Sequence, residues 1–414
     1  MQSMEKVLLL IIGLSGFQCT HTVIVRGEIW RKKRDDGSYC YVYNMYDVHT
    51  SMHHPEAQLK QKINNLVIDQ GEALLRNFKK LNPQFTKIVV EDSASNRDGT
   101  YAMPIELLNI MDKLPNQSRE LVDRFFVRMK DAGISQAINI EYRQKRLTLM
   151  GYVQIVNLMG SLEAAVNSPE TQGSVKDQII PLLDLYRQVG LTLENLEKFK
   201  GHFKVNNSTL LEEVSVAINT IQAYQDGQVL SQYYQLEVAR IKTSNNRINQ
   251  LLNTFKEKTF GSVLGSFVSE SEGALFQTVF PYWGASLLDA NALHEIYQAG
   301  QSIQKIFFLA GGAHSYTVAT MLPRIGYELV YETGINKSML EPIHKKFTEV
   351  EVATDVAMNM GWEQWNRMMQ DNAGQLSRLF AVFKKRIPFN KVFFDLMLSD
   401  NPEEGGALGH GPIQ

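Results

Sequence analysis

Three apolar runs of this sequence end in residues that can perform acid–base or metal chemistry. The run CYVYNMYDVH ends in Asp47 and His49, KIVVED ends in Glu91 and Asp92, and IFFLAGGAH ends in His314. Each run has the β-branched and aromatic content of a buried strand. In open α/β sheets, side chains that follow the carboxyl ends of strands converge on the crevice in which ligands bind. We therefore predict that His49, Glu91 and His314 point into one crevice.

Two histidines and a carboxylate suit two kinds of chemistry. Imidazole and carboxylate together bind zinc and other first-row divalent ions and leave coordination positions for water. A metal ion held in this way lowers the pKa of its bound water to about 7, which makes a nucleophile at neutral pH. Without a metal ion, a histidine acts as a general base that a carboxylate orients. Both routes predict hydrolysis, with His49, Glu91 and His314 as metal ligands or, together with Asp47, as catalytic residues.

The loop after the first run is rich in histidine. In YDVHTSMHHPEAQ, three of the nine histidines of the chain lie within six positions: His49, His53 and His54. We place His49 inward and the other two on the loop that rims the same crevice. His54 stands directly before Pro55, where a helix is expected to begin. A surface role is the favoured interpretation of His53 and His54.

Further polar residues and glycines flank the predicted site. Asp47 and Asp92 are suited to accept the second ring N–H of a histidine and so to fix its tautomer, although an acidic residue after a strand can also cap the next helix. Gly311 and Gly312 provide backbone freedom at the strand-to-loop turn before His314. The candidate cofactor-binding residues are Gly311, Gly312, Asp92 and His53.

The residues around the first two runs predict a first α/β half at residues 21–103. TVIVRGEIW and SYCYVYNMYDVH have strand patterns, and the turn dipeptide Asp36-Gly37 between them predicts a hairpin. After Pro55, apolar residues recur at the spacing of an amphipathic helix. TKIVVEDSASN then predicts a buried strand that leads into a loop. The recurring apolar residues are Leu59, Ile63, Leu66, Leu74, Phe78 and Leu81.

Residues 104–260 predict a helical insertion, because helical patterns such as SRELVDRFFVRMKDAG and SVKDQIIPLLDLYRQVG follow one another without a strand pattern. A second α/β half follows at residues 261–400. It contains a helix (DANALHEIYQAGQ), a strand (KIFFLAGG), a loop (AHSYT), a helix (VATMLPRIG), a strand (YELVYET) and C-terminal helices. The order strand, helix, strand predicts a parallel pairing with a crossover. Residues 401–414 lack apolar periodicity and predict a flexible tail.

Together these patterns predict an α/β fold in which a central mixed β-sheet is flanked by helices. Neither α/β half alone has the roughly 4–6 strands of a typical sheet, so we expect both halves to share one sheet. A large all-helical insertion separates them. Because the insertion stands between the two halves of the predicted site, it is the expected source of substrate specificity, as a lid over the crevice.

Composition excludes some classes of partner and suggests a location. The 414 residues are 44% hydrophobic and 21% charged with a formal net charge of -2, which is typical of a globular protein and argues against nucleic acid as a partner. Residues 1–20 carry an apolar run of signal-peptide length, too short to span a bilayer. We predict a signal peptide and export, with membrane association only through an uncleaved N-terminus; the alternative is a buried first strand.

Several segments resemble a known superfamily. EIWRKKRDDGSYCYVYNMYDVH, KIVVED and the later FFLAGGAHSYTVATMLPRIGYELVYE resemble the superfamily that joins TraB/PrgY, GumN and Tiki-type proteins with ChaN-like and erythromycin-esterase-like proteins. The Tiki and TraB signature is a Trp-containing hairpin, a first G-x-x-H, an acidic residue after the next strand, and a second G-x-x-H before a helix that ends in Gly-Tyr. The matching residues are Trp30, His49, Glu91, Gly311 to His314, and Gly326-Tyr327.

The ChaN-like branch of the superfamily has an acidic residue two positions before the first histidine and further histidines after it. Asp47, His53 and His54 resemble that version. The sequence departs from the family pattern in two places. Tyr46 stands where the first motif has glycine, and SLLDANALHEI replaces an arginine-containing segment before the second motif. The departures indicate a divergent branch, and they put in doubt any role that needs the arginine.

The resemblance implies four functions of different classes. The first is a metal-dependent hydrolase or peptidase that uses one divalent ion, and the second is a metal-independent, erythromycin-esterase-like hydrolase. Both imply a small-molecule or peptide substrate. The third is a non-enzymatic, haem-binding protein of ChaN-like type, with the loop histidines and Tyr46 facing the ligand. The fourth is an inactive interaction scaffold. A hydrolase ranks first on the sequence.

Overall fold

The computed structural model describes six stretches of the chain: residues 20–51, 57–91, 125–140, 171–188, 288–340 and 391–399, with residues 166, 167, 169 and 402. The predicted signal peptide, up to residue 19, and the predicted flexible tail, apart from residue 402, lie outside the described residues. No helix within these stretches is long and apolar enough to cross a membrane.

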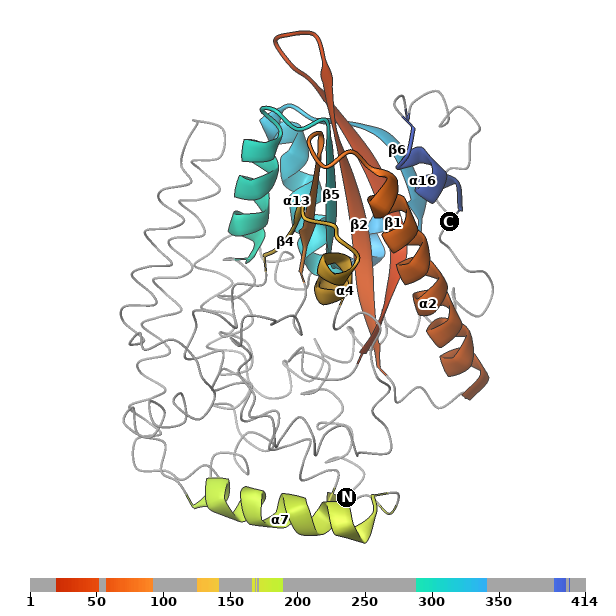
Figure 1. The fold of residues 1–414 in the computed structure, drawn as a ribbon, viewed down its shortest axis with the longest axis vertical. Coiled ribbons are helices and arrows are strands. Elements are labelled where there is room, and N and C mark those ends of the chain that lie inside the picture. The colour runs from red at the N-terminus through yellow and green to blue at the C-terminus, as the bar shows by residue number, and fades with distance from the viewer. Residues whose placement is uncertain are drawn as a thin grey trace.

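A six-stranded mixed sheet forms the centre of the fold (Figure 1). Its strands lie in the order β4-β3-β5-β2-β1-β6. Neighbouring strands from β4 to β2 are parallel, and β1 is antiparallel to both β2 and β6. The strands are β1 (Thr20–Lys33), β2 (Tyr39–Ser51), β3 (Thr86–Val90), β4 (Ala137–Asn139), β5 (Lys305–Gly311) and β6 (Glu328–Gly334). Because β5 lies between β2 and β3, the prediction that both α/β halves share one sheet is confirmed.

The first two strands form the predicted hairpin. β1 and β2 pair in antiparallel register from Thr20 opposite Ser51 to Lys33 opposite Tyr39. The turn between them contains Gly37 with a φ of 84°, a left-handed conformation that glycine adopts without steric cost. The turn dipeptide therefore marks the position of the hairpin correctly.

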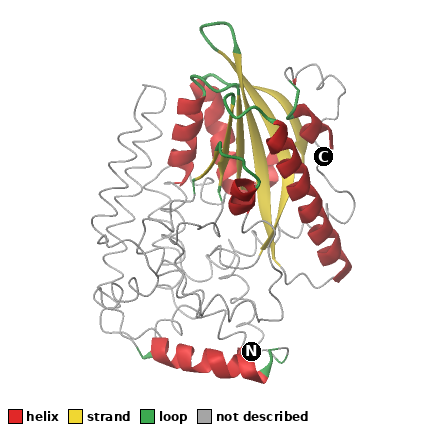
Figure 2. Ribbon diagram, viewed as in Figure 1, coloured by secondary structure: helices red, strands yellow, loops and turns green. Residues whose placement is uncertain are grey.

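Helices cover both faces of the sheet (Figure 2). One face packs against α2 (Ala57–Lys80), α4 (Phe125–Asp131) and α16 (Lys391–Leu396), whose apolar residues share a core with alternate residues of β2, β3 and β5. The other face packs against α13 (Gly312–Met321), which contacts β2 and β5, and a helix over 288–299 lies beside α13. The 3-10 turns η1 (Leu322–Ile325) and η2 (Lys337–Leu340) flank β6. These elements form an α/β fold with three layers.

Aromatic side chains fill the core on the α2 face. The rings of Tyr43 and Phe307, on the adjacent strands β2 and β5, stack with centroids 4.5 Å apart. Phe78 of α2 meets Phe307 edge-on at 5.3 Å, and Phe393 of α16 meets Tyr43 at 6.2 Å. Such pairs add about 0.5–1.5 kcal/mol each beyond the area that they bury. They fix the face of the sheet that carries α2, and thereby leave the other face to α13.

The prediction of an all-helical segment over residues 104–260 is wrong at Ala137–Asn139, which form β4. The backbone of Ile88 donates to Gln136 and that of Ile140 donates to Val90, so hydrogen bonds to β3 hold this short edge strand. Three residues are too few to show the period-two pattern by which a strand is recognised. Elsewhere in the segment, α4 and α7 (Gly173–Arg187) fall on predicted helical runs; residues 141–165 and 189–287 lie outside the described ones.

Two predictions for the second half are also corrected. The predicted pairing of β5 with β6 is absent, because β6 pairs with β1. The crossover is present, and β6 runs in the same direction as β5, since β1 is antiparallel to both β2 and β6 and β2 is parallel to β5. Both edges of β5 are already occupied, by β2 and β3, so the chain crosses two strands before it adds β6. The predicted loop AHSYT is helical, since α13 begins at Gly312 directly after β5.

Candidate functional site

The predicted strand ends lie at one edge of the sheet. In the parallel pairing of β2 with β5, Asp47 stands opposite Gly311, and in that of β3 with β5, Val90 stands opposite Leu309. Glu91 follows Val90 directly, and α13 begins one residue after Gly311. After β2 the chain continues into α2 on one face, and after β5 it continues into α13 on the other face (Figure 1). Ligands of open α/β sheets bind between two adjacent parallel strands whose following helices lie on opposite faces of the sheet. β2 and β5 are such a pair.

Glu91 is held by the end of β5. Its backbone N–H donates to Leu309 O at 2.9 Å, and its side-chain Oε2 accepts the backbone N–H of Gly311 at 2.8 Å. Gly311 is the N-cap of α13 and carries no side chain that could cap the helix. The carboxylate therefore supplies negative charge at the helix N-terminus, where it is favourable. This contact satisfies the N–H of the N-cap residue, as the glutamate of a capping box does.

His314 lies in the first turn of α13 between two carboxylates. Its Nδ1 is 2.7 Å from Asp289 Oδ1, and its Nε2 is 3.6 Å from Glu91 Oε1. The side chains of His314 and Glu91 are each 10% exposed and that of Asp289 is 5% exposed. An ionised carboxylate only accepts hydrogen bonds, so an ionised Asp289 takes the proton of Nδ1, and in the neutral imidazole the lone pair of Nε2 then faces Glu91. Glu91 and His314, which lie 223 positions apart in the chain (314 minus 91), are thus neighbours.

Asp289 is a site residue that the sequence did not reveal. It belongs to SLLDANALHEI, the segment that stands in place of the family's arginine-containing one, and lies at the start of the helix over 288–299. An aspartate at the beginning of a helical pattern indicates helix capping, so the residue type carried no other signal. The segment brings a carboxylate to the site where the family resemblance implies an arginine.

The remaining predicted residues are placed in part. His49 lies in β2, two residues beyond Asp47, and its backbone pairs with Thr22 of β1. The side chain of His49 is outside the described part. Asp47 is buried, with 8% of its surface exposed, opposite Gly311. Gly311 and Gly312 form the junction between β5 and α13, as described above. His53, His54 and Asp92 lie outside the described residues.

Tyr46, which the haem-binding alternative expects to face the ligand, is packed inside the protein. It is fully buried, and its hydroxyl donates to Glu28 Oε2 at 2.7 Å. Successive residues of a strand point to opposite faces, and Tyr46 points to the face covered by α13, as Asn44 does. The bulky side chain that replaces glycine in the first motif is therefore accommodated within the protein.

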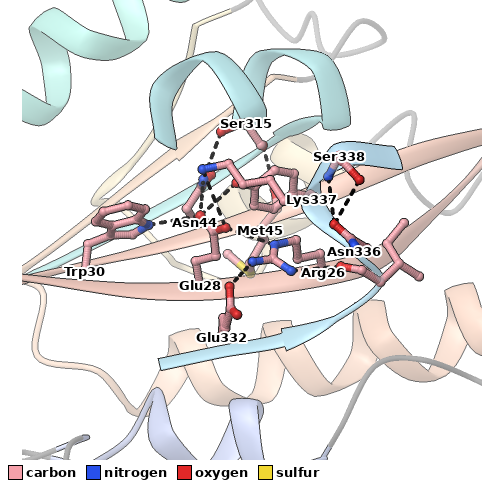
Figure 3. Close-up of polar contacts among 12 residues, drawn as sticks. Arg26, Glu28, Trp30, Asn44, Met45, Ser315, Glu332, Asn336, Lys337 and Ser338 are labelled. Carbon is pink, nitrogen blue, oxygen red and sulfur yellow. Dashed lines mark hydrogen bonds and ion pairs between the residues drawn. The ribbon is translucent and has the colours of Figure 1, made fainter. Parts of the chain in front are cut away.

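A buried charged cluster, which the sequence also did not reveal, surrounds Glu28 (Figure 3). Glu28 has no exposed surface, and its oxygens accept from Arg26 Nε at 2.9 Å and Trp30 Nε1 at 3.0 Å. Arg26 also pairs with Glu332 and donates to Ile335 O at 2.8 Å. We call this group the Glu28 cluster; its members are Arg26, Glu28, Trp30, Asn44, Tyr46, Glu332 and Lys337.

The electrostatics of the Glu28 cluster follow from burial and mutual attraction. Burial alone lowers the pKa of Arg26, but Glu28 and Glu332 more than offset this and raise it above its usual value. Burial, followed by the charge of Glu28, raises the pKa of Tyr46 well above its usual value. Burial also lowers the pKa of Lys337, whose Nζ is 3.9 Å from Glu28 Oε1. Charges of opposite sign are thus matched within the cluster.

The Glu91–His314 pair fits a metal ion as two of its ligands. Ligating histidines usually donate their second ring N–H to a carboxylate, as His314 does to Asp289. Ligand atoms about 2.0–2.2 Å from one ion lie within roughly 4 Å of each other, and Nε2 and Oε1 satisfy this at 3.6 Å. Within the described stretches, no three His, Cys, Asp or Glu side chains form a metal-binding group. The third predicted ligand, His49, therefore stays a prediction.

Three comparisons with known proteins found no match. No family model matches the chain, and neither a curated protein nor a solved structure does.

Proposed function

We propose that the protein is a hydrolase in which the attacking water is activated between Glu91 and His314. The observation that carries this proposal is the arrangement of the imidazole: Nδ1 is committed to Asp289 at 2.7 Å, while Nε2 is directed at Glu91 Oε1 at 3.6 Å. The family resemblance of the strand-end motifs supports the same conclusion, and we propose that the chain is a divergent member of the TraB/Tiki and ChaN-like superfamily.

The distance between Nε2 and Oε1 is the physical basis of the proposal. With the ring proton on Nδ1, both facing atoms are hydrogen-bond acceptors. At 3.6 Å they are too far apart for a direct hydrogen bond, and two acceptors are reconciled by a water molecule or a cation that both contact. A water placed there can transfer a proton to Nε2 while Glu91 holds its other hydrogen.

A divalent metal ion is the alternative occupant of the same position. When bound by His314 and Glu91, it would supply a water of lowered pKa, about 7. In that case Asp289 keeps its role, because it orients the ring and increases the basicity of the ligating nitrogen. The predicted third ligand, His49, belongs to the neighbouring strand β2. Both routes lead to hydrolysis, and they differ in their response to chelators.

We further propose that residues 104–260, apart from β4, are a largely helical insertion that covers this edge of the sheet and selects the substrate. The support is the helical periodicity of the sequence and the position of α7 within it. The predicted signal peptide belongs to the same proposal, in which the hydrolase acts outside the cytoplasm on a small molecule or peptide.

The test uses the full-length protein, purified without chelators. Its metal content is measured, and hydrolysis is assayed on chromogenic esters, lactones and a quenched-fluorescence peptide library. We expect hydrolysis that His314→Gln and Glu91→Gln abolish, whereas Glu328→Gln, which changes an exposed carboxylate on β6, leaves it intact. Loss of activity after dialysis against a chelator, with recovery on addition of zinc or manganese, identifies the metal route.

Two outcomes would contradict the proposed hydrolase function. One is full activity of the His314→Gln variant, which would place the chemistry elsewhere. The other is the absence of hydrolysis and of bound metal, combined with a Soret band on titration with haem. That second result would favour the haem-binding alternative.

A further inference from the structure

The Glu28 cluster lies directly beneath the helix that carries His314. It contains two cationic and two anionic side chains, of which Arg26 is 2% exposed and Glu28 is fully buried. Removing charges from water is costly, and hydrophobic replacements of buried ion pairs are often equally stable or more stable. A contribution to stability therefore does not explain the cluster, whereas the fixing of one specific geometry does.

The cluster reaches α13 through Asn44. The amide Nδ2 of Asn44 donates to Ser315 O at 3.0 Å and lies 3.5 Å from Glu28 Oε2 (Figure 3). The hydroxyl of Ser315 in α13 in turn approaches backbone carbonyls of the strands: it is 2.9 Å from Met45 O of β2 and 3.2 Å from Ala310 O of β5. Side-chain hydrogen bonds in both directions thus join the first turn of α13 to β2.

Lys337 holds the same turn from another side. Its Nζ lies 5.5 Å from the ring centre of Tyr316 and 5.6 Å from that of Trp30, within the range of cation–π attraction. Ser315 and Tyr316 are the two residues that follow His314. The turn is therefore fixed at two positions adjacent to the imidazole.

We propose that Asn44 is a positioning residue, which transmits the geometry of the Glu28 cluster to Ser315 and thereby holds His314 against Asp289 and Glu91. The inference rests on the proposed function, because it concerns the activity of that site. The side chain of Asn44 bonds Ser315 O and approaches Glu28, so its effect on His314 passes through α13. A small displacement of a reacting group, on the order of 1 Å, is enough to lower a rate about 100-fold, so a rigid helix start has catalytic value.

The primary test observes His314 and does not require activity. The low-field NMR signal of the Nδ1–H that bonds Asp289 is followed in the full-length protein and assigned with His314→Gln. Asn44→Leu and Ser315→Ala should each shift or broaden this signal, and Ser315→Thr, which keeps the hydroxyl, should retain it. Thr317→Val is the matched control, because the Thr317 hydroxyl bonds Ala313 O within the same helix.

The signal of His314 in variants of Asn44 decides the matter. A signal unchanged in folded Asn44→Leu overturns the positioning role. If Asn44→Leu does not fold, Asn44→Ala, which also removes the donor to Ser315 O, carries the decision. Where hydrolysis is found, both Asn44→Leu and Ser315→Ala should lower kcat about tenfold with little change in KM. A shifted signal in a protein without hydrolysis upholds the positioning role while the proposed function fails, so the two failures are distinguishable.

Discussion

At the scale of single residues, the protonation pattern of His314 determines what the site can do. Asp289 and Glu91 flank the ring, but only Asp289, at 2.7 Å from Nδ1, is close enough for a hydrogen bond. Glu91, at 3.6 Å from Nε2, is instead anchored by the N–H of Gly311. The two carboxylates therefore have different roles: Asp289 orients the ring, and Glu91 faces Nε2.

The first prediction concerns this division of roles. Asp289→Asn should lower hydrolysis, or metal affinity if the site binds metal, by about 10–100-fold. The neutral amide accepts the Nδ1 proton less strongly, and it can rotate to donate, which stabilises the wrong tautomer. Initial rates and metal titrations measure the effect. Asp184→Asn, in an exposed ion pair on α7, is the control and should change neither quantity; an equal loss in both variants would contradict the prediction.

A second prediction at this scale concerns Tyr46. Tyr46→Phe should lower the free energy of unfolding at pH 7 by about 1.5–3 kcal/mol, because it removes a buried hydrogen bond to a carboxylate. Urea unfolding followed by circular dichroism provides the measurement. Tyr39→Phe is the matched control: Tyr39 is 37% exposed, so its replacement should cost less than about 0.5 kcal/mol.

The difference in free energy of unfolding between wild type and Tyr46→Phe should change in a defined direction at alkaline pH. The pKa of Tyr46 is raised in the folded state, so the folded protein retains this proton after the unfolded chain loses it. The stability from Tyr46 is therefore fully present below the unfolded pKa of about 10 and is lost as pH rises beyond it. The difference between wild type and Tyr46→Phe should shrink above about pH 10. A difference that grows there would contradict the assigned shift.

At the scale of elements, the sequence predicted the long and strongly patterned ones. The hairpin and α2 show strand or helical patterns over their length, and β3 and β5 are short continuous apolar runs. The apolar positions Leu74, Phe78 and Leu81 of the α2 pattern are buried as expected. Elements determined by tertiary contacts were not predicted. β4 exists because β3 offers it hydrogen bonds, and the start of α13 is joined to Glu91, which follows β3 in the chain and accepts the N–H of the N-cap residue Gly311.

The candidate site divides in the same way. Glu91 and His314 were predictable because strand ends of parallel strands share one edge of a sheet. Asp289 was not, because it comes from a helix whose position relative to His314 depends on the packing of that helix. The Glu28 cluster was not predicted because alternating charged residues on a strand, Arg26 and Glu28, ordinarily indicate an exposed face. Only the position of α13 shows that this face is covered.

The prediction at this scale concerns the end of β6. Gly334 has a φ of 103°, and a Cβ atom at this position would lie 2.2 Å from Val25 O of β1. Gly334→Ala should therefore cost about 2–5 kcal/mol, from backbone strain and the steric clash together. Gly37→Ala is the control: its φ is 84°, but nothing lies within 4 Å, so strain alone should cost about 1–2 kcal/mol. Equal losses in urea unfolding would contradict the importance of the close contact.

At the scale of the whole molecule, the sheet joins the two ends of the described chain. β5 separates β2 from β3, so strands from the first half pair with a strand more than 200 residues later. The position of β5 between β2 and β3 also brings His314 beside Glu91 and aligns Asp47 with Gly311. Sheet and site therefore form together, because both depend on the docking of β5. Pairing at such separation is expected to make folding slow.

The last prediction tests this dependence by cutting the chain before α7, into fragments of residues 1–170 and 171–414. The first fragment retains β1 to β4 but leaves the inner edges of β2 and β3 without β5. Neither fragment alone should unfold cooperatively, and the first should associate through its open strand edges. An equimolar mixture should recover the cooperative transition and the low-field signal of His314. Circular dichroism, size-exclusion chromatography and NMR measure these properties. The control is a chain truncated after residue 399, which retains every described strand. Cooperative unfolding of residues 1–170 alone would show that β5 is not required and that the two halves are independent domains.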